Sequence, residues 1–286
     1  MSGDSNEIFQ GLRGEPFRQM ITNLLSRGKL KEKYLRLLID DYGISKYEQA
    51  FTSASANSDS NYEIFEQLGD VSANKFIVWY MYRRFPQLNC PLGVKVVARL
   101  RINYGARQTF SEIADNLGFW GFISASVEER GHKKKDLLED CFESFIGVTE
   151  FLLDERTRPG VGYSIVYDIL SSIFNEIDIS LRYEDLYDAK TRLKELLDIH
   201  SDLGSLVYQD VRGDKLTVST LFLVPIGANK QFLGNKQPRK EWVRIGQGTA
   251  AKQKDSQQNA AQRGLFYLNS QGYIRQVPEE YKKFCL

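Results

Sequence analysis

The segment that most constrains the fold of this chain is Tyr62–Arg83, in which apolar residues recur with the spacing of an α-helix. At about 100° per residue, Glu63, Glu66 and Asp70 fall on one narrow stripe of that helix. Farther along, the same stripe turns apolar at Ile77, so we expect the face that carries the acids to be buried. Carboxylates four residues apart repel each other by roughly a few tenths of a kcal/mol, and a bound cation would offset that repulsion. An amphipathic helix whose acids happen to align is the alternative.

A second helix-periodic segment, Asp136–Asp154, carries the same pattern. Its stripe holds Asp140, Glu143 and Gly147, and the glycine would let another helix approach closely. Packed through these stripes, the two helices would gather four carboxylates in one site, which is costly unless cations neutralise them. Oxygen ligands favour the hard cations Mg²⁺ and Mn²⁺. The four acids are Glu66, Asp70, Asp140 and Glu143.

Motifs in and around these segments resemble those of the ribonuclease III family. Residues 62–70 (YEIFEQLGD) resemble the family signature NERLEFLGD, and residues 140–147 (DCFESFIG) resemble its second acidic motif. Residues 50–55 (AFTSAS) and 80–86 (YMYRRFP) resemble the stretches that flank the signature. The resemblance covers most of the chain.

The resemblance implies metal-binding and catalytic roles for the four candidate acids and a supporting role for Glu63. Several other positions depart from the family motifs: Tyr62 stands where the family has Asn, Ile64 for Arg, Gln67 for Phe and Ser53 for His. We interpret these departures as losses of supporting contacts around a retained catalytic set.

Composition bounds the class of protein. The 286 residues are 42% hydrophobic and 26% charged, enough for two domains of moderate size. No apolar run reaches the roughly 20 residues of a membrane-spanning helix, and the first residues do not resemble a secretory signal. We therefore expect an intracellular protein without membrane contact. Three distant cysteines and two histidines support neither a disulfide framework nor a zinc site.

The pattern of the chain predicts four segments. Residues 1–30 form an N-terminal extension, and residues 31–183 form an all-α endonuclease domain without strands. Residues 184–272 form a small α+β domain, and residues 273–286 form a C-terminal tail. Besides the two acidic helices, the first two segments are expected to include helices at Glu15–Leu25, Lys29–Tyr42 and Ser164–Ile177.

Residues 184–272 predict the order α-β-β-β-α, typical of a double-stranded RNA-binding domain. Residues 188–193 (DAKTRL) resemble the opening of the domain that follows ribonuclease III catalytic modules, and residues 248–254 (GTAAKQK) resemble the start of its second helix. The expected elements are a helix at 187–198, strands at Ser205–Val211, Leu216–Ile226 and Glu241–Gly246, and a helix at Thr249–Leu268.

The resemblance implies that this domain meets RNA phosphates through lysines and amide dipoles at the start of its second helix. Lys252 and Lys254 stand at that helix start. The resemblance also assigns RNA contacts to Thr191 and Glu195 on the first helix.

A long basic insertion at residues 228–240 is a further candidate for RNA contact. Two positions, Ala250 and Gln253, depart from the family's RNA-binding motif. A docking domain that no longer binds RNA is therefore the alternative. The candidate contacts in the insertion are Lys236, Arg239 and Lys240.

Charge is divided unevenly along the chain. Residues 186–286 hold 16 Lys and Arg against 10 Asp and Glu, whereas residues 1–185 have a net charge of −5. A basic module beside an acidic one suits polyanion binding next to metal-dependent catalysis. Together with this charge distribution, the resemblance to the ribonuclease III family implies a Mg²⁺- or Mn²⁺-dependent endoribonuclease that hydrolyses double-stranded RNA by a two-metal mechanism.

In the family, each catalytic domain cuts one strand, so a single copy per chain implies a homodimer. We expect the subunit contact near Phe65 and Leu68, beside the signature acids. A catalytically inactive RNA-binding or scaffold protein of the same family is the alternative function.

Overall fold

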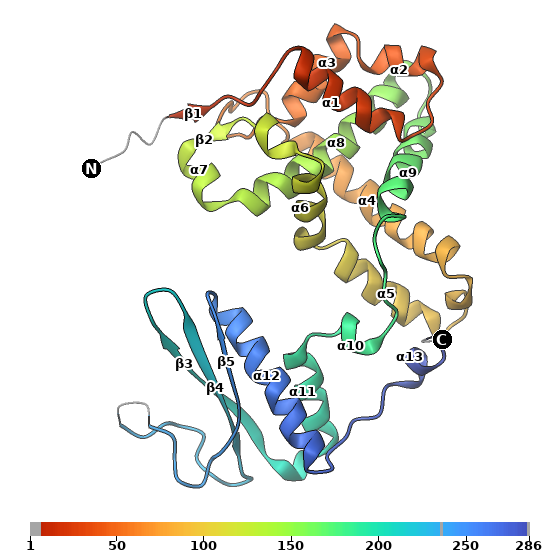
Figure 1. The fold of residues 1–286 in the computed structure, drawn as a ribbon. Helices are drawn as coiled ribbons and strands as arrows, with labels where there is room; N and C mark the ends of the chain where they lie inside the picture. The colour runs from red at the N-terminus through yellow and green to blue at the C-terminus, as the bar shows by residue number, and fades with distance from the viewer. Residues whose placement is uncertain (1–6, 235–236, 285–286) are drawn as a thin grey trace. The chain divides into compact units, whose positions relative to one another are not determined.

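The computed structural model describes residues 7–234 and 237–284. The chain forms two compact units, Met1–Ile179 and Ser180–Leu286 (Figure 1). The expected fold class is confirmed, because the first unit is helical and the second combines helices with a three-stranded sheet. Within the two described ranges, no helix is long and apolar enough to cross a membrane.

Helices make up nearly all regular structure of the first unit. One small sheet pairs β1 (Ile8–Phe9) antiparallel with β2 (Ala125–Ser126). The expectation that residues 31–183 contain no strand is wrong at β2, because two paired residues are too few to show the alternation that predicts a strand. The helices are α1 (Glu15–Ser26), α2 (Glu32–Leu38), α3 (Asp41–Ala50), α4 (Glu63–Arg84), α5 (Gly93–Tyr104), α6 (Arg107–Asn116), α7 (Val127–His132), α8 (Lys134–Arg156) and α9 (Val161–Phe174), with the 3₁₀ turns η1 (Pro86–Leu88) and η2 (Phe119–Phe122).

The segment expected as one helix, Lys29–Tyr42, contains all of α2 and the start of α3. The Asp40 side chain caps α3 by accepting the N–H of Gly43 at 2.7 Å. A side-chain acceptor at this position satisfies a backbone donor that lacks a partner at the start of a helix. The single-helix expectation is therefore wrong, because this local cap competes with helix continuation.

The two acidic helices, α4 and α8, cross at a pair of glycines. A Cβ atom added to Gly69 would lie 1.8 Å from the carbonyl oxygen of Glu143. One added to Gly147 would lie 2.0 Å from the carbonyl oxygen of Phe65. The expected role of Gly147 is confirmed, and close backbone contact also accounts for Gly69.

A series of buried aromatic rings joins α1 to α8 through the middle of the first unit. Phe17 of α1 packs edge-on against Phe51, with ring centroids 5.3 Å apart. Phe51 packs against Phe119 at 4.8 Å, and Phe119 packs against Phe142 of α8 at 6.3 Å. The helix expected in the N-terminal extension therefore forms part of the core.

The second unit has the expected order of helices and strands. Its antiparallel sheet has the strand order β3-β4-β5. The helix expected at Thr249–Leu268 begins later than expected, since Thr249 and Ala250 pair with β4 at the end of β5. The elements are α10 (Tyr183–Leu186), α11 (Ala189–Ile199), η3 (Ser201–Leu203), β3 (Ser205–Arg212), β4 (Thr217–Val224), β5 (Val243–Ala250), α12 (Gln253–Ser270) and α13 (Glu279–Lys282).

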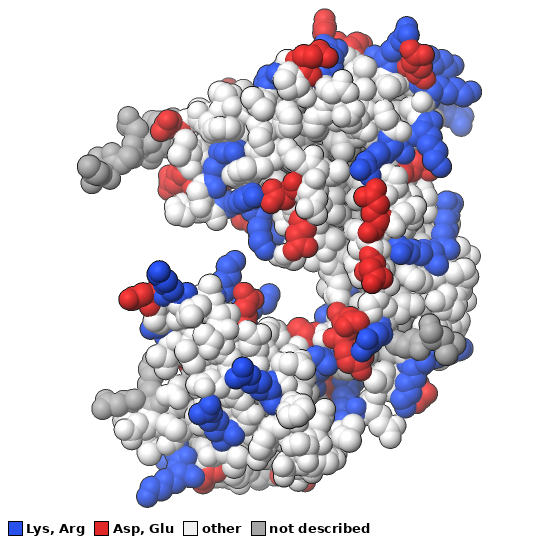
Figure 2. Space-filling model, in the orientation of Figure 1, with Lys and Arg blue, Asp and Glu red and all other residues white. Residues whose placement is uncertain are grey.

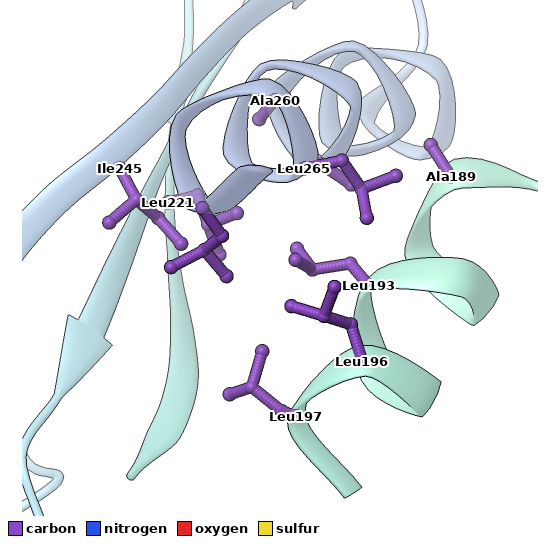
Figure 3. Packing of buried hydrophobic residues seen from close by; sticks show 10 residues of the cluster. Ala189, Leu193, Leu196, Leu197, Leu221, Ile245, Ala260 and Leu265 are labelled. Atoms are coloured by element: carbon purple, nitrogen blue, oxygen red, sulfur yellow. The ribbon is translucent and has the colours of Figure 1, made fainter. Parts of the chain in front are cut away.

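One face of this sheet packs on α11 and α12 (Figure 3). Leu193 of α11, Leu221 of β4 and Leu265 of α12 meet in that core. Successive strand residues point to opposite faces, and Phe222 accordingly belongs to a second cluster with Val224 and Trp242. The insertion between β4 and β5 contributes to this second cluster and covers part of the other face of the sheet.

Candidate active site

The four acids predicted from the sequence lie on the two helices that cross at the glycine pair. Glu66 and Asp70 are one turn apart on α4, and Asp140 and Glu143 are one turn apart on α8. Glu143 is buried, Glu66 and Asp140 are half-buried, and Asp70 is exposed. The site is thus a cluster of four carboxylates at the edge of the helix crossing, and it is open to solvent on the α4 side.

The charges of these acids act on one another across the two helices. Burial, followed by the negative charges of Asp70 and Glu139, raises the pKa of Glu143 to about 8. Burial, followed by the charge of Asp140, raises the pKa of Glu66 to about 7. Burial also raises the pKa of Asp140 above its usual range. The structure therefore brings the acids of α4 and α8 into one electrostatic group.

The ligand atoms at this site, carboxylate oxygens, are of the kind that binds divalent cations. All four candidate ligands are carboxylates, the donors that Mg²⁺ and Mn²⁺ prefer. Their shared negative charge disfavours ionisation of Glu66 and Glu143 until a positive charge is present. In the part of the chain that the structure describes, no three acidic, histidine or cysteine side chains are already arranged to hold a metal ion, so the four carboxylates would have to move closer together to bind one.

Tyr62 holds one of these acids in place. Its hydroxyl donates a hydrogen bond to Oδ2 of Asp140 at 2.8 Å, and its ring is buried. The backbone N–H of Tyr62 donates to the carbonyl of Thr52 at 2.9 Å. The Ser144 hydroxyl of α8 donates to the Tyr62 carbonyl at 3.2 Å. The interpretation of Tyr62 as a lost supporting contact is therefore wrong, because the tyrosine itself supplies a contact to the site.

Ser53, another departure from the family motif, also has a definite contact. The hydroxyls of Ser53 and Ser55 both donate to Oε2 of Glu129, at 2.7 and 2.6 Å. Lys133 pairs with the other oxygen of that carboxylate at 3.2 Å. This network ties the segment before α4 to α7, so a supporting contact exists here as well.

Glu139 is part of the acidic group and was not predicted. Its charge contributes to the raised pKa of both Glu66 and Glu143. Arg107 of α6 pairs with Glu139 at 2.5 Å and with Asp136 at 2.7 Å. Glu139 lies about 100° from Asp140 around the helix, so a search restricted to one stripe passes over it.

Glu63 and Asp70 lie on the exposed side of α4. The charge of Glu63 contributes to the raised pKa of Glu66, in keeping with a supporting position. The side-chain amide of Asn74 donates to Oδ1 of Asp70 at 2.7 Å and to its backbone carbonyl at 2.9 Å. Asp70 is thus held by its own helix, whereas Asp140 is held from α4.

The RNA-contact candidates on α11 have partners within the second unit. The hydroxyl of Thr191 donates to Oδ2 of Asp188 at 2.8 Å, next to the cap of α11. The carboxylate of Glu195 pairs with Arg275 and accepts a hydrogen bond from the hydroxyl of Tyr183. Both side chains therefore contribute to the structure of the unit itself.

The basic candidates lie at opposite ends of β5. Lys252 and Lys254 are exposed at the start of α12, which follows the end of the strand. Lys240 is exposed, and Arg239 is half-buried, in the insertion that precedes the strand. Lys236 lies outside the described residues.

Comparison with known proteins places the chain in a family. The sequence-family model of the ribonuclease III domain matches residues 63–151, which include all four acids. A protein of Invertebrate iridescent virus 6, provisionally named ribonuclease 3, is 40% identical over 295 residues, covering 98% of this chain and 97% of that protein. The chain belongs to the ribonuclease III family. Membership classifies it among the endoribonucleases.

Further members of the ribonuclease III family are similar to the chain over different shares of their length. A protein of Frog virus 3, also provisionally named ribonuclease 3, is 38% identical over 90% of this chain and 64% of its own length. Ribonuclease 3 of Limosilactobacillus reuteri is 30% identical over 76% of this chain and 86% of that protein. The nuclease domain of ribonuclease III from Campylobacter jejuni is similar in structure, with a TM-score of 0.42 and 23% identity over 56% of this chain and 99% of that domain.

Proposed function

We propose that the protein hydrolyses phosphodiester bonds of double-stranded RNA at the cluster of four carboxylates between α4 and α8. The observation that carries the proposal is the mutual repulsion of Glu66, Asp140 and Glu143 at a helix crossing in a ribonuclease III family member. Acids held together against their own repulsion indicate a site that works with a cation bound.

The proposed ligands of Mg²⁺ or Mn²⁺ are Glu66, Asp70, Asp140 and Glu143. Bound there, such ions supply an activated water and neutralise charge on the phosphate and its leaving oxygen. Glu66 and Glu143 would release their protons as they become ligands, since ligands bind metal in the deprotonated form. Tyr62 keeps Oδ2 of Asp140 oriented through its 2.8 Å hydrogen bond. Asn74 keeps Asp70 oriented in the same way on α4.

A homodimer is the second part of the proposal. Each chain carries one acidic group, and a cut through a duplex requires two strands to be hydrolysed. Leu68 and Val71 of α4 are 45% and 68% exposed and line an apolar hollow of about 480 Å³ with Phe151 and Pro159. A second copy seated on this hollow would bury these side chains.

The dimer expectation is corrected at Phe65. That ring is buried within its own unit and packs against Phe151, with centroids 5.5 Å apart. Leu68 and Val71, on the exposed side of α4, are the side chains available to a partner.

A cleavage assay tests the proposal. Full-length protein is incubated with labelled duplex RNA and Mg²⁺, Mn²⁺ or EDTA, and products are separated by size. We expect short duplex products with either metal and none with EDTA. Glu143→Gln and Asp140→Asn should abolish cleavage and retain RNA binding in a gel-shift assay. Unchanged cleavage by both variants would show that the bond is broken at another site.

The same assay separates the enzyme from the inactive RNA-binding alternative. An inactive family member would bind the duplex equally well with and without metal and release no product under any condition. Single-stranded RNA of the same sequence serves as the control for duplex specificity.

A further inference from the structure

The insertion between β4 and β5 is anchored on the sheet. The Trp242 ring is buried and packs against Phe232 of the insertion, with centroids 4.9 Å apart, and against Phe222 of β4 at 5.9 Å. The indole N–H of Trp242 donates to the carbonyl of Asn229 at 3.1 Å. Nε of Arg239 donates to the carbonyl of Gln231 at 2.7 Å. These contacts fix the two arms of the insertion to each other and to the sheet.

This anchored segment is strongly basic. Residues 228–244 contain five Lys and Arg against one Glu, a net charge of +4. Lys230, Lys240 and Arg244 are exposed, and the Arg244 guanidinium donates a hydrogen bond to a neutral group, Oε1 of Gln247, at 2.8 Å. Among the described residues, no carboxylate pairs with Lys230, Arg239, Lys240 or Arg244. In Figure 2, blue side chains lie over the lower part of this unit with little red between them.

The opposite end of the sheet, where the family resemblance places phosphate contacts, is close to neutral. The turn at residues 210–215 has two basic and two acidic residues, and residues 252–255 have a net charge of +1. Asp210 accepts hydrogen bonds from Gln253 and Gln257 of α12, both at 2.7 Å, so its charge lies beside the first turn of that helix. A carboxylate there opposes the approach of a phosphate.

The two ends are too far apart to form one contact patch. The eight residues of β5, Val243–Ala250, join the insertion to the start of α12. At a rise of about 3.3 Å per residue, the strand separates them by about 23 Å. Each end therefore meets a different stretch of any bound polyanion.

We propose that Lys230, Lys240 and Arg244 at the insertion end, with Arg239 holding the loop, form the main phosphate-contacting surface of the second unit. The ligand is the backbone of duplex RNA, and this assignment rests on the proposed function of the first unit. The proposal places the stronger electrostatic contact at the end of the sheet remote from Lys252 and Lys254. An anchored surface loses less conformational entropy on binding than a loose basic loop would.

The test is fluorescence anisotropy of the full-length protein with a labelled RNA duplex of about 24 base pairs, longer than the roughly 16 that such a domain spans. EDTA is present throughout to prevent cleavage. The insertion variant is Lys230→Gln/Lys240→Gln/Arg244→Gln, which leaves Arg239 and its hydrogen bond in place. The matched variant at the other end is Lys252→Gln/Lys254→Gln. Circular dichroism and the melting temperature report whether each variant keeps the fold.

We expect the insertion variant to bind at least about tenfold more weakly and to lower the slope of log affinity against log salt by about 2.7, or 0.9 for each of three contacts. The Lys252/Lys254 variant should show the smaller loss of affinity. The charge-preserving variant Lys230→Arg/Lys240→Arg/Arg244→Lys should bind as the wild type does.

Three results would overturn the assignment. One is an insertion variant with unchanged affinity and salt slope beside a Lys252/Lys254 variant that loses binding. Another is an equal loss in both variants, which would leave no main surface. The third is an insertion variant that binds RNA as the wild type does but no longer binds poly-glutamate, which would assign the surface to an acidic protein. A wild-type protein that cleaves no duplex RNA contradicts the proposed function instead, and the two failures are therefore distinguishable.

Discussion

The Tyr62 hydroxyl donates a 2.8 Å hydrogen bond to Oδ2 of Asp140, across 78 positions of sequence. The bond joins the residue that precedes α4 to the acidic face of α8, so one candidate metal ligand is oriented by the opposite helix. Groups that orient metal ligands typically change metal affinity or activity by about 10–100-fold when removed.

Tyr62→Phe should therefore lower duplex cleavage by about tenfold or more and raise the Mg²⁺ concentration needed for half-maximal activity. The Phe ring fills the same buried space, so the melting temperature should change little. Tyr163→Phe is the matched control, because the Tyr163 hydroxyl has no hydrogen-bond partner among the residues described. Equal activity of the two variants would remove Tyr62 from any positioning role.

Gly69→Ala should destabilise the first unit by more than about 2 kcal/mol, because the new methyl group would overlap the backbone of α8 in a packed core. A Cβ at that position lies 1.8 Å from the Glu143 carbonyl oxygen. Gly131→Ala in α7 is the control, since nothing lies within 4 Å of its Cβ, and it should be neutral or slightly stabilising. Urea unfolding followed by circular dichroism measures both variants.

The metal-free protein should lose stability as pH rises from 5 to 8. The folded-state pKa values of Glu66 and Glu143 are raised to about 7 and about 8, from an ordinary value of 4.5. The folded state then holds more protons than the unfolded state between these values, so raising the pH favours unfolding. The melting temperature in EDTA should fall across this range.

Mg²⁺ should raise the melting temperature more at pH 8 than at pH 5, because fewer protons compete for the ligands at the higher pH. The double variant Glu66→Gln/Glu143→Gln should show a flatter pH profile in EDTA and little response to Mg²⁺. A wild-type profile that rises with pH would contradict the proposed proximity of these acids.

Leu68→Asp/Val71→Asp should convert the proposed dimer to a monomer, because charged side chains on an apolar contact surface disfavour its burial. Light scattering at micromolar concentration measures the mass. Ile102→Asp on α5, where Ile102 is 56% exposed, is the control for adding an acidic residue at an exposed apolar site. A wild-type protein that is monomeric and still cuts both strands would contradict the dimer.

Trp242→Ala should destabilise the second unit by about 3–5 kcal/mol, the usual range for removing a buried Trp ring. The control is Phe266→Ala in α12, where the ring is 77% exposed and its loss should have little effect. Urea unfolding of each variant, followed by circular dichroism, compares the two losses.

Much of the site follows from helical periodicity. The apolar spacing and the two acidic stripes predict α4 and α8 to within two residues at each end. The placement of Glu66 and Glu143 in one electrostatic group follows from packing those two stripes together. These features are local or involve only one pair of helices, and they can therefore be predicted from the sequence.

Contacts between distant segments could not be predicted in this way. The partner of Tyr62 depends on how the start of α4 faces α8, and the resemblance to the family suggests only that Asn has been replaced. The sequence predicts too early a start for α12, because strand pairing of Thr249 with Val218 overrides the local helical pattern. The aromatic cluster around Trp242 brings Phe222 of β4 together with Phe232 of the insertion, and a strand pattern within one segment does not indicate which residues of another segment it contacts.

The aromatic series from Phe17 to Phe142 has a practical consequence for anyone who shortens this protein. The family match begins at residue 63, yet Phe119 inside the matched region packs on Phe51, which lies before it. Phe142 packs in turn on Phe119. A fragment cut to the matched residues would expose these ring faces to water and invite aggregation during expression. The smallest fragment that retains the aromatic core must include Phe17, so its boundary lies about forty-five residues ahead of the start of the family match.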